Sequence, residues 1–146
     1  MKQNIPFNKP YTFKSELDYI NQVFKKQKFT DGYFQQKCEK LIKRKINSNF
    51  IALTQSCTSA LEIIMLLIKL KKDDEVIMPS YTFTSTANSV ILRGAKPVFV
   101  DVNPDDINLN PKLVEKKINK KTKAIILVHY GGNSCEMNSL LKLKKK

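Results

Sequence analysis

The chain has 146 residues, of which 42% are apolar, so it is long enough for a packed core and is not expected to be disordered. Its formal net charge is +13, but only Arg44 and Arg93 of its 26 basic residues are arginines and 24 are lysines, a mixture that argues against sequence-specific nucleic-acid recognition. There is no apolar run of membrane-spanning length, no signal-peptide pattern and no metal or redox spacing among the three cysteines, so we expect a reduced, cytoplasmic protein that has no membrane partner.

The first 48 residues predict an arm followed by two helices. Residues 1–14 contain two prolines and are expected to be extended. Apolar residues then recur at helical spacing over residues 15–27 and again over residues 33–46, and the segment KFTDG separates the two runs. We therefore expect two amphipathic helices in this part of the chain.

From residue 49 onward, strand and helix patterns alternate. The expected strands are residues 50–54, 75–79, 96–102 and 123–129. The expected helices are residues 56–70, 84–94 and 110–118, and one that begins at residue 136. Ser59 and Glu62 have the spacing of a capping box, Gly94 is a typical helix stop, and Pro111 suits a first helical turn.

This alternation predicts an α/β fold with a three-layer, mostly parallel sheet and helices on both faces. We expect residues 1–48 to form an N-terminal arm with helices and residues 49–146 to form the sheet-containing part. In such sheets ligands bind at the carboxyl ends of the strands, where the following helices begin. Three places in the chain meet that description.

The first is the segment LTQSCTSALEII, in which a strand ending near Thr54 leads into a helix that opens near Thr58. Free N–H groups at a helix N-terminus, beside small hydroxyl residues such as Ser59, can bind a phosphate. The alternative is a helix cap with no ligand, because Ser and Thr are common capping residues. No glycine-rich nucleotide fingerprint is present.

The second is the segment MPSYTFTSTAN, one strand later, where Phe83 lies at the junction between strand and helix. An aromatic side chain at this point can stack on a flat ring held by the first loop. The alternative is that Phe83 is a core residue.

The third is the end of the strand AIILVH, where His129 is the only histidine. No Ser, Cys or Asp in the sequence is spaced to form a triad with it, so a structural role is the simpler interpretation. Asp101, at the end of another strand, is expected to cap a turn or to pair with a lysine. The lysine runs are interpreted as solvated helix faces.

Taken together, these segments resemble the N-terminal part of the DegT-type nucleotide-sugar aminotransferases, which use pyridoxal phosphate and have fold type I. The resemblance runs almost end to end and includes IPFNKP, SCTSALE, DDEVIMPSYTFTSTANSVILRGAKPVFVDV, and VHYGG followed by CEM. The most similar subgroup makes dTDP-4-amino-4,6-dideoxygalactose from a dTDP-4-keto-6-deoxy sugar.

The resemblance implies roles for particular residues. Thr58 and Ser59 are expected to hold the cofactor phosphate, and Phe83 is expected to stack on the pyridine ring. Residues 29–32 match a part of the family that lies near the substrate. Glutamate is the implied amino donor, a homodimer the implied assembly of the full-length form, and the biosynthesis of cell-surface polysaccharide such as lipopolysaccharide the implied pathway.

The resemblance also implies that this chain is an N-terminal fragment. Family members are longer and carry, beyond the residues that match this chain, an Asp-Ala-Ala strand whose Asp pairs with the pyridine nitrogen. A Schiff-base lysine and a small C-terminal domain follow that strand. We therefore assign no catalytic residue and expect the chain to be inactive alone. A frame shift in the lysine codons of the segment KLKKK, residues 142–146, is our hypothesis for the missing part.

Three alternatives remain open at this point. The chain can be a non-catalytic remnant with an aggregation-prone sheet edge, because a strand without a neighbour exposes unpaired backbone groups. It can be one half of a split enzyme whose second half is encoded nearby. It can also be a basic module that binds nucleic acid through its charge, the least favoured of the three.

Overall fold

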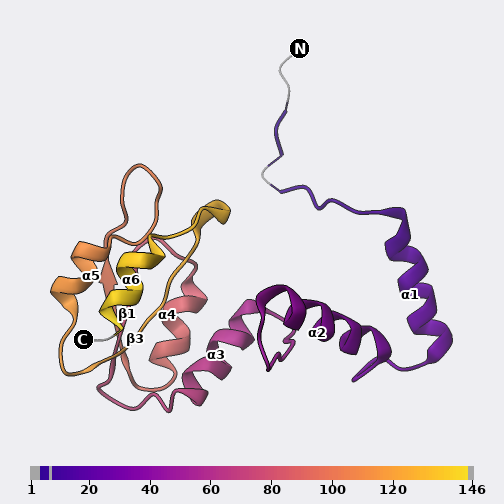
Figure 1. Ribbon diagram of the computed structural model, residues 1–146, viewed down its shortest axis with the longest axis horizontal. Coiled ribbons are helices and arrows are strands. Elements are labelled where there is room, and N and C mark those ends of the chain that lie inside the picture. The colour runs from indigo at the N-terminus through magenta and orange to yellow at the C-terminus, as the bar shows by residue number, and fades with distance from the viewer. Residues whose placement is uncertain (1–3, 7, 145–146) are drawn as a thin grey trace. The chain divides into compact units, whose positions relative to one another are not determined.

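The computed structural model describes residues 4–6 and 8–144. Figure 1 traces the elements from the N-terminus in indigo to the C-terminus in yellow. In chain order they are α1 (Lys14–Lys26), α2 (Tyr33–Ile46), α3 (Cys57–Leu67), β1 (Glu75–Pro79), α4 (Thr84–Ile91), β2 (Lys96–Val100), α5 (Pro111–Lys117), β3 (Thr122–Ile125), η1 (Tyr130–Gly132) and α6 (Met137–Leu143). The chain forms two compact units, Met1–Leu53 and Thr54–Lys146, which are called the N-terminal unit and the sheet unit below.

The N-terminal unit contains the two predicted amphipathic helices. The prediction for α2 is confirmed at both ends, and α1 lies one residue earlier than expected. Each helix ends at a residue in the left-handed conformation, Gln27 after α1 and Asn47 after α2. Neither helix has a buried residue, and the apolar stripe of α1, which includes Ile20 and Phe24, is exposed. The predicted apolar faces are therefore present, but the face of α1 is exposed and that of α2 is at most half-buried, at Phe34 and Ile42.

The sheet unit is built on three parallel strands in the order β2-β1-β3. Because β1 has a hydrogen-bonded neighbour on each side, its residues Val76, Ile77 and Met78 have no exposed surface. The predicted parallel sheet is thus confirmed. Its middle strand forms the centre of the fold.

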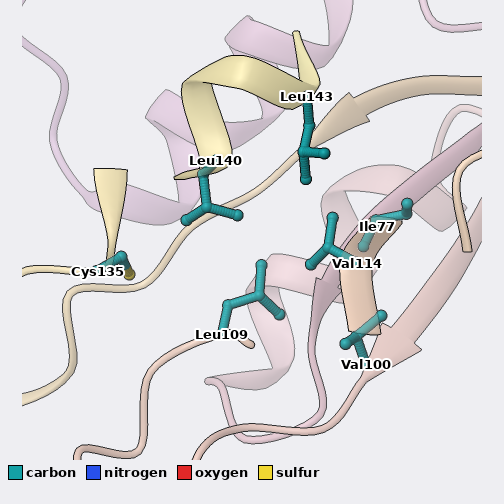
Figure 2. Packing of buried hydrophobic residues seen from close by; sticks show 7 residues of the cluster. All are labelled: Ile77, Val100, Leu109, Val114, Cys135, Leu140 and Leu143. Atoms are coloured by element: carbon teal, nitrogen blue, oxygen red, sulfur yellow. The ribbon is translucent and has the colours of Figure 1, made fainter. Parts of the chain in front are cut away.

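Side chains along β1 alternate between the two faces of the sheet. Ile77 packs with Leu109 and Val114 in one cluster, to which α6 adds two leucines. Figure 2 shows Leu140 and Leu143 of α6 pointing toward Leu109 and Val114. Full burial of such a side chain is worth about 1.5–3 kcal/mol, so this face contributes substantially to folding.

The opposite face of the sheet packs against α3 and α4. Val76 and Met78 belong to a second cluster together with Met65 of α3 and Val90 of α4. Helices therefore cover both faces of the sheet, as the alternation of elements predicts.

The predicted strand at residues 50–54 is wrong. This segment has no regular secondary structure, and none of the strands in the described residues hydrogen-bonds to it. Its first residue, Phe50, is 88% exposed and bonds instead to the side chain of Ser48, with its N–H 3.3 Å from the serine Oγ. An apolar run becomes a strand only where a neighbouring strand is available.

Two other strands are shorter than predicted. β3 ends at Ile125 and not at His129, although the N–H of Ile126 still donates to the carbonyl of Ile77 at 2.8 Å. β2 ends at Val100, after which Val102 forms an isolated antiparallel bridge with Leu109. Both segments leave the sheet near its carboxyl edge. Polar loops begin at this edge.

Candidate active site

The loops after β1 and β2 are joined at the carboxyl edge of the sheet. The N–H of Ser80 donates to the carbonyl of Val100 at 2.8 Å, and its hydroxyl donates to Asp101 Oδ1 at 3.2 Å. The partner of Asp101 is therefore a serine and not the lysine considered above. Asp101 thus ties two loops of the site together.

The N-terminus of α3 is capped by Ser56. The Ser56 Oγ accepts the N–H of Ser59 at 3.1 Å, and the two hydroxyls lie 3.1 Å apart. Ser59 is therefore not the cap that the capping-box spacing suggests, because it already lies in the first helical turn. The N–H groups of Cys57 and Thr58, ahead of it in that turn, can have no partner inside the helix and remain available to an anion.

The N-termini of α3 and α4 lie at the same end of the sheet unit. Thr58 and Glu62 of α3 line one shallow hollow of about 230 Å³ together with three residues of α4 and the residue that follows it: Ser85, Asn88, Ile91 and Leu92. Because Thr58 and Ser85 both belong to first turns, the positive ends of the two helix dipoles are neighbours. The two junctions that the sequence singles out are thus brought together.

Phe83 is the residue immediately before α4, and its side chain is 75% exposed. The interpretation of Phe83 as a core residue is therefore wrong for this structure. The loop that carries it is held at one end, since the hydroxyls of Thr82 and Thr86 are hydrogen-bonded at 2.9 Å. An exposed ring on a held loop can stack on a planar ligand.

A pair of tyrosines connects the carboxyl ends of β1 and β3. The rings of Tyr81 and Tyr130 have centroids 5.1 Å apart, and the Tyr130 hydroxyl donates to that of Tyr81 at 3.3 Å. This hydrogen bond raises the pKa of Tyr130 above its ordinary value, since the bond stabilises the protonated hydroxyl. The pair is therefore joined both by a ring contact and by a hydrogen bond.

His129 lies beyond the end of β3, just before η1. Its Nδ1 accepts the backbone N–H of Cys135 at 3.0 Å. A ring nitrogen that accepts an N–H carries no hydrogen itself, so the proton of the neutral imidazole is on Nε2. His129 is thus held in one tautomer and can present Nε2–H as a donor.

Three features of this site were not predicted from the sequence: the cap Ser56, the tyrosine pair and the buried Asn108. Ser56 stands three residues before Ser59, which is the ordinary distance from a cap to the N–H it accepts. Tyr81 and Tyr130 follow two strands at their carboxyl ends, so the rule for parallel sheets points to both. Asn108 lies in a turn and gives no comparable signal.

The arrangement suits a ligand that combines an anion with a flat ring. Hydroxyls and unpaired N–H groups at the start of α3 can bind a phosphate, and the exposed ring of Phe83 can stack beside it. Residues able to transfer a proton nearby are His129 and the tyrosine pair. Among the described side chains no lysine is part of this group.

Other kinds of site find no support in the described residues. No cluster of three His, Cys, Asp or Glu side chains could hold a metal ion there, and all three cysteines are free thiols. The described helices include none with the length and apolar character to cross a membrane.

Comparison with known proteins confirms the resemblance seen in the sequence. Residues 10–146 match the DegT/DnrJ/EryC1/StrS aminotransferase family. The chain is 36% identical to an uncharacterized protein of Methanocaldococcus jannaschii over 97% of its length, and 32% identical to the spore coat polysaccharide biosynthesis protein SpsC of Bacillus subtilis over 94%. Among solved structures, it is similar to the sugar aminotransferase Spr1654 of Streptococcus pneumoniae in its pyridoxal phosphate form, with a TM-score of 0.90 and 30% identity over 98% of the chain.

The chain spans about a third of the length of these relatives. It covers 36% of the Methanocaldococcus protein, 35% of SpsC and 37% of Spr1654. The likeness therefore concerns one part of a longer fold.

Proposed function

Because the chain belongs to the DegT/DnrJ/EryC1/StrS aminotransferase family, we propose that it carries the phosphate-binding and ring-stacking part of a pyridoxal phosphate site. The complete protein of this type would be a sugar aminotransferase. One observation carries the proposal: the uncapped N–H groups at the start of α3 lie beside the start of α4, where Phe83 is exposed.

Thr58 and Ser59 would hold the phosphate. Their hydroxyls stand next to the first-turn N–H groups of α3, and the helix dipole adds a favourable field for a dianion. Glu62, one turn further along, places a carboxylate in the hollow between α3 and α4 and would disfavour an anion there. The phosphate is therefore expected at the helix end and not along the helix.

Phe83 would fix the plane of the pyridine ring by stacking on it. The loop around Phe83 is held by the Thr82–Thr86 bond, so the ring approaches the ligand from a defined direction. Pyridoxal phosphate supplies an electron sink that allows an amino group to pass from an amino acid to a keto carbon. Near it, the tyrosine pair and the Nε2–H of His129 would offer hydrogen bonds to substrate hydroxyls.

We extend the proposal to the substrates of the complete protein. The amino acceptor would be a dTDP-4-keto-6-deoxy sugar, the donor glutamate, and residues 29–32 would lie near the sugar nucleotide in a homodimer. The name of SpsC, a spore coat polysaccharide biosynthesis protein, supports a role in making a cell-surface polysaccharide.

The test uses pyridoxamine 5′-phosphate, which has no aldehyde and so cannot react with the 24 lysines. In a chain labelled with nitrogen-15, and with carbon-13 in its phenylalanine rings, titration should shift the amides of residues 57–59 and perturb the ring signals of Phe83. Inorganic phosphate alone should shift only the first group. This difference separates binding of the phosphate from binding of the ring.

Two variants sharpen the titration. Phe83→Leu should lower the affinity for pyridoxamine phosphate roughly threefold to tenfold, because stacking is worth about 0.5–1.5 kcal/mol. It should leave the affinity for inorganic phosphate unchanged. Phe99→Leu, at another exposed phenylalanine of the sheet unit, is the matched control. Shifts spread over the lysine-rich surface, with residues 57–59 unmoved, would contradict the proposal.

A further inference from the structure

The side chain of Asn108 is buried under the segment that carries His129 and Tyr130. Only 1% of Asn108 is exposed, and it lies in the loop between β2 and α5. Its Nδ2 donates to the carbonyls of Asn133 at 3.2 Å and Ser134 at 3.3 Å. Its Oδ1 accepts the N–H of Tyr130 at 3.2 Å, so both ends of the amide contact the same segment.

The loop that holds Asn108 is itself well defined. The N–H of Asn108 donates to Asp106 Oδ1 at 2.9 Å, and its carbonyl accepts the N–H of Asn103 at 2.8 Å. The next residue, Leu109, is 1% exposed and forms the bridge to Val102. Asn108 is therefore attached to the hydrophobic core at its own position.

The segment of residues 129–135 meets the hydrophobic core through Cys135, which is 3% exposed and packs in the cluster of Ile77 and Leu140. It contains Gly131 and Gly132, both at positive φ, and its other backbone bonds are local. Apart from its bonds to Asn108, this segment forms one described hydrogen bond to a residue far away in the sequence, from Tyr130 to Tyr81. Asn108 thus supplies most of the distant hydrogen bonds of this segment, beside the apolar packing of Cys135.

The contacts of Asn108 lead on to the site. Cys135 follows the two carbonyls that Asn108 binds, its thiol lies 3.6 Å from Asn108 Oδ1, and its N–H donates to His129 Nδ1 at 3.0 Å. Tyr130, held by Asn108 through its N–H, contacts Tyr81 on the loop that carries Phe83. One buried amide therefore underlies the tautomer of His129 and the placement of the tyrosine pair.

We infer that Asn108 is a positioning residue of this site, which holds residues 129–135 so that His129 keeps Nδ1 as an acceptor and Nε2–H as a donor. The inference rests on the proposed function, because only that function makes these residues part of a cofactor site. The geometry itself does not depend on a bound cofactor. An amide is suited to this task because it presents two donors and an acceptor at one point. A carboxylate lacks the donors, and an aliphatic side chain lacks all three groups.

The test uses the fact that His129 is the only histidine, so histidine labelled with nitrogen-15 gives signals from a single imidazole. In the full chain we expect the shifts of one tautomer, with Nδ1 as the acceptor. We also expect the amide protons of Tyr130 and Cys135 to exchange with solvent at least tenfold more slowly than those of an unstructured peptide. Exchange at the unstructured rate in the unmodified chain would overturn the inference.

Asn108→Leu should release the segment. The His129 ring should move to the tautomer mixture of free histidine, and the exchange of both amides should accelerate at least tenfold, while the amides of Val76 and Ile77 in β1 remain protected. Asn133→Leu is the matched control, because Asn133 forms its hydrogen bonds in the described structure through its backbone N–H and carbonyl, which the substitution keeps. Unchanged His129 signals in Asn108→Leu would contradict the inference.

Asn108→Asp serves if the leucine variant does not fold. It keeps an oxygen for the N–H of Tyr130 and removes both donors, so Cys135 should lose protection while Tyr130 retains it. Equal protection of both amides, as in the unmodified chain, would overturn the inference. These measurements need no ligand. If pyridoxamine phosphate fails to bind, the proposed function is rejected, whereas the positioning role of Asn108 is not affected.

Discussion

The helices of the N-terminal unit and those of the sheet unit carry similar apolar patterns but have different surroundings. α1 and α2 have no buried residue, whereas α3 to α6 cover two faces of a sheet and bury residues in both clusters. An amphipathic pattern therefore specifies a helix and the face it presents, but not whether anything covers that face. Stability and the candidate site are both concentrated where the sheet supplies a partner.

The largest expected effect comes from one substitution made in each region. Ile77→Ala, at the fully buried centre of β1, should reduce the free energy of unfolding by about 2–5 kcal/mol, because it leaves a cavity in the core. Ile20→Ala, on the exposed stripe of α1, should change it by less than about 0.5 kcal/mol. Urea unfolding followed by circular dichroism measures both, and equal effects would contradict the comparison.

Helix capping should show an intermediate difference. Ser56→Ala removes the bond to the N–H of Ser59 and should cost about 1 kcal/mol. Phe13 precedes α1 without a side-chain cap, so Phe13→Asp should instead increase the helix content. A loss of helix in Phe13→Asp, measured by circular dichroism, would contradict this. It would show that the phenylalanine ring stabilises α1 more than a capping carboxylate does.

The open edge of the sheet should affect association more than folding. β3 has a neighbour on one side only, and next to it a hollow of about 540 Å³ is lined by apolar residues such as Leu127 and Leu141. We expect the purified chain to self-associate through this edge, as unpaired strands with apolar surroundings do. Leu141→Lys, at a residue 54% exposed, should reduce the sedimentation coefficient with little change in stability, whereas a monomeric unmodified chain would contradict this expectation.

The smallest effects concern two tyrosines, one in each unit. The hydrogen bond with Lys37 lowers the pKa of Tyr33, whereas the bond with Tyr81 raises the pKa of Tyr130. Tyr33 therefore adds stability above the ordinary tyrosine pKa, and this is lost as the pH falls through its lowered value. Tyr130 adds stability below the ordinary pKa, and this is lost as the pH rises through its raised value.

Absorbance at 295 nm, followed during alkaline titration, tests these directions. Tyr33→Phe should remove an early step of the titration, and Tyr130→Phe should remove a late one. The reverse order would show that the two hydrogen bonds do not form in solution.

Sequence reasoning worked best where a residue's own neighbours decide the structure. The bounds of α2 and β1 are as predicted, because helical spacing and a short apolar run ended by Pro79 are local signals. Residues 50–54 have the same apolar character as β1, yet they lack a neighbouring strand and form none. Pairing depends on distant residues, which the local pattern does not contain.

The same division holds for the site. The junction between β1 and α4 was found from the sequence, because the rule for parallel sheets converts order along the chain into position in space. The start of α3 was found from its small hydroxyl residues, although the strand predicted before it does not form. The cap was placed at Ser59 and not Ser56 because helix ends are poorly defined by spacing alone. Asn108 was missed since its importance comes from contacts with residues more than 20 positions away.

The central claim is that this chain binds a phosphate and an aromatic ring together at the start of α3 and α4. Calorimetric titration of the purified chain with pyridoxamine 5′-phosphate and with pyridoxamine, which lacks the phosphate, tests it most directly. We predict one site for the phosphate ester and at least a tenfold weaker affinity for pyridoxamine, since hydrogen bonds to a charged group are worth about 1.5–3 kcal/mol. Equal affinities for the two compounds, or no binding of either, would contradict the claim.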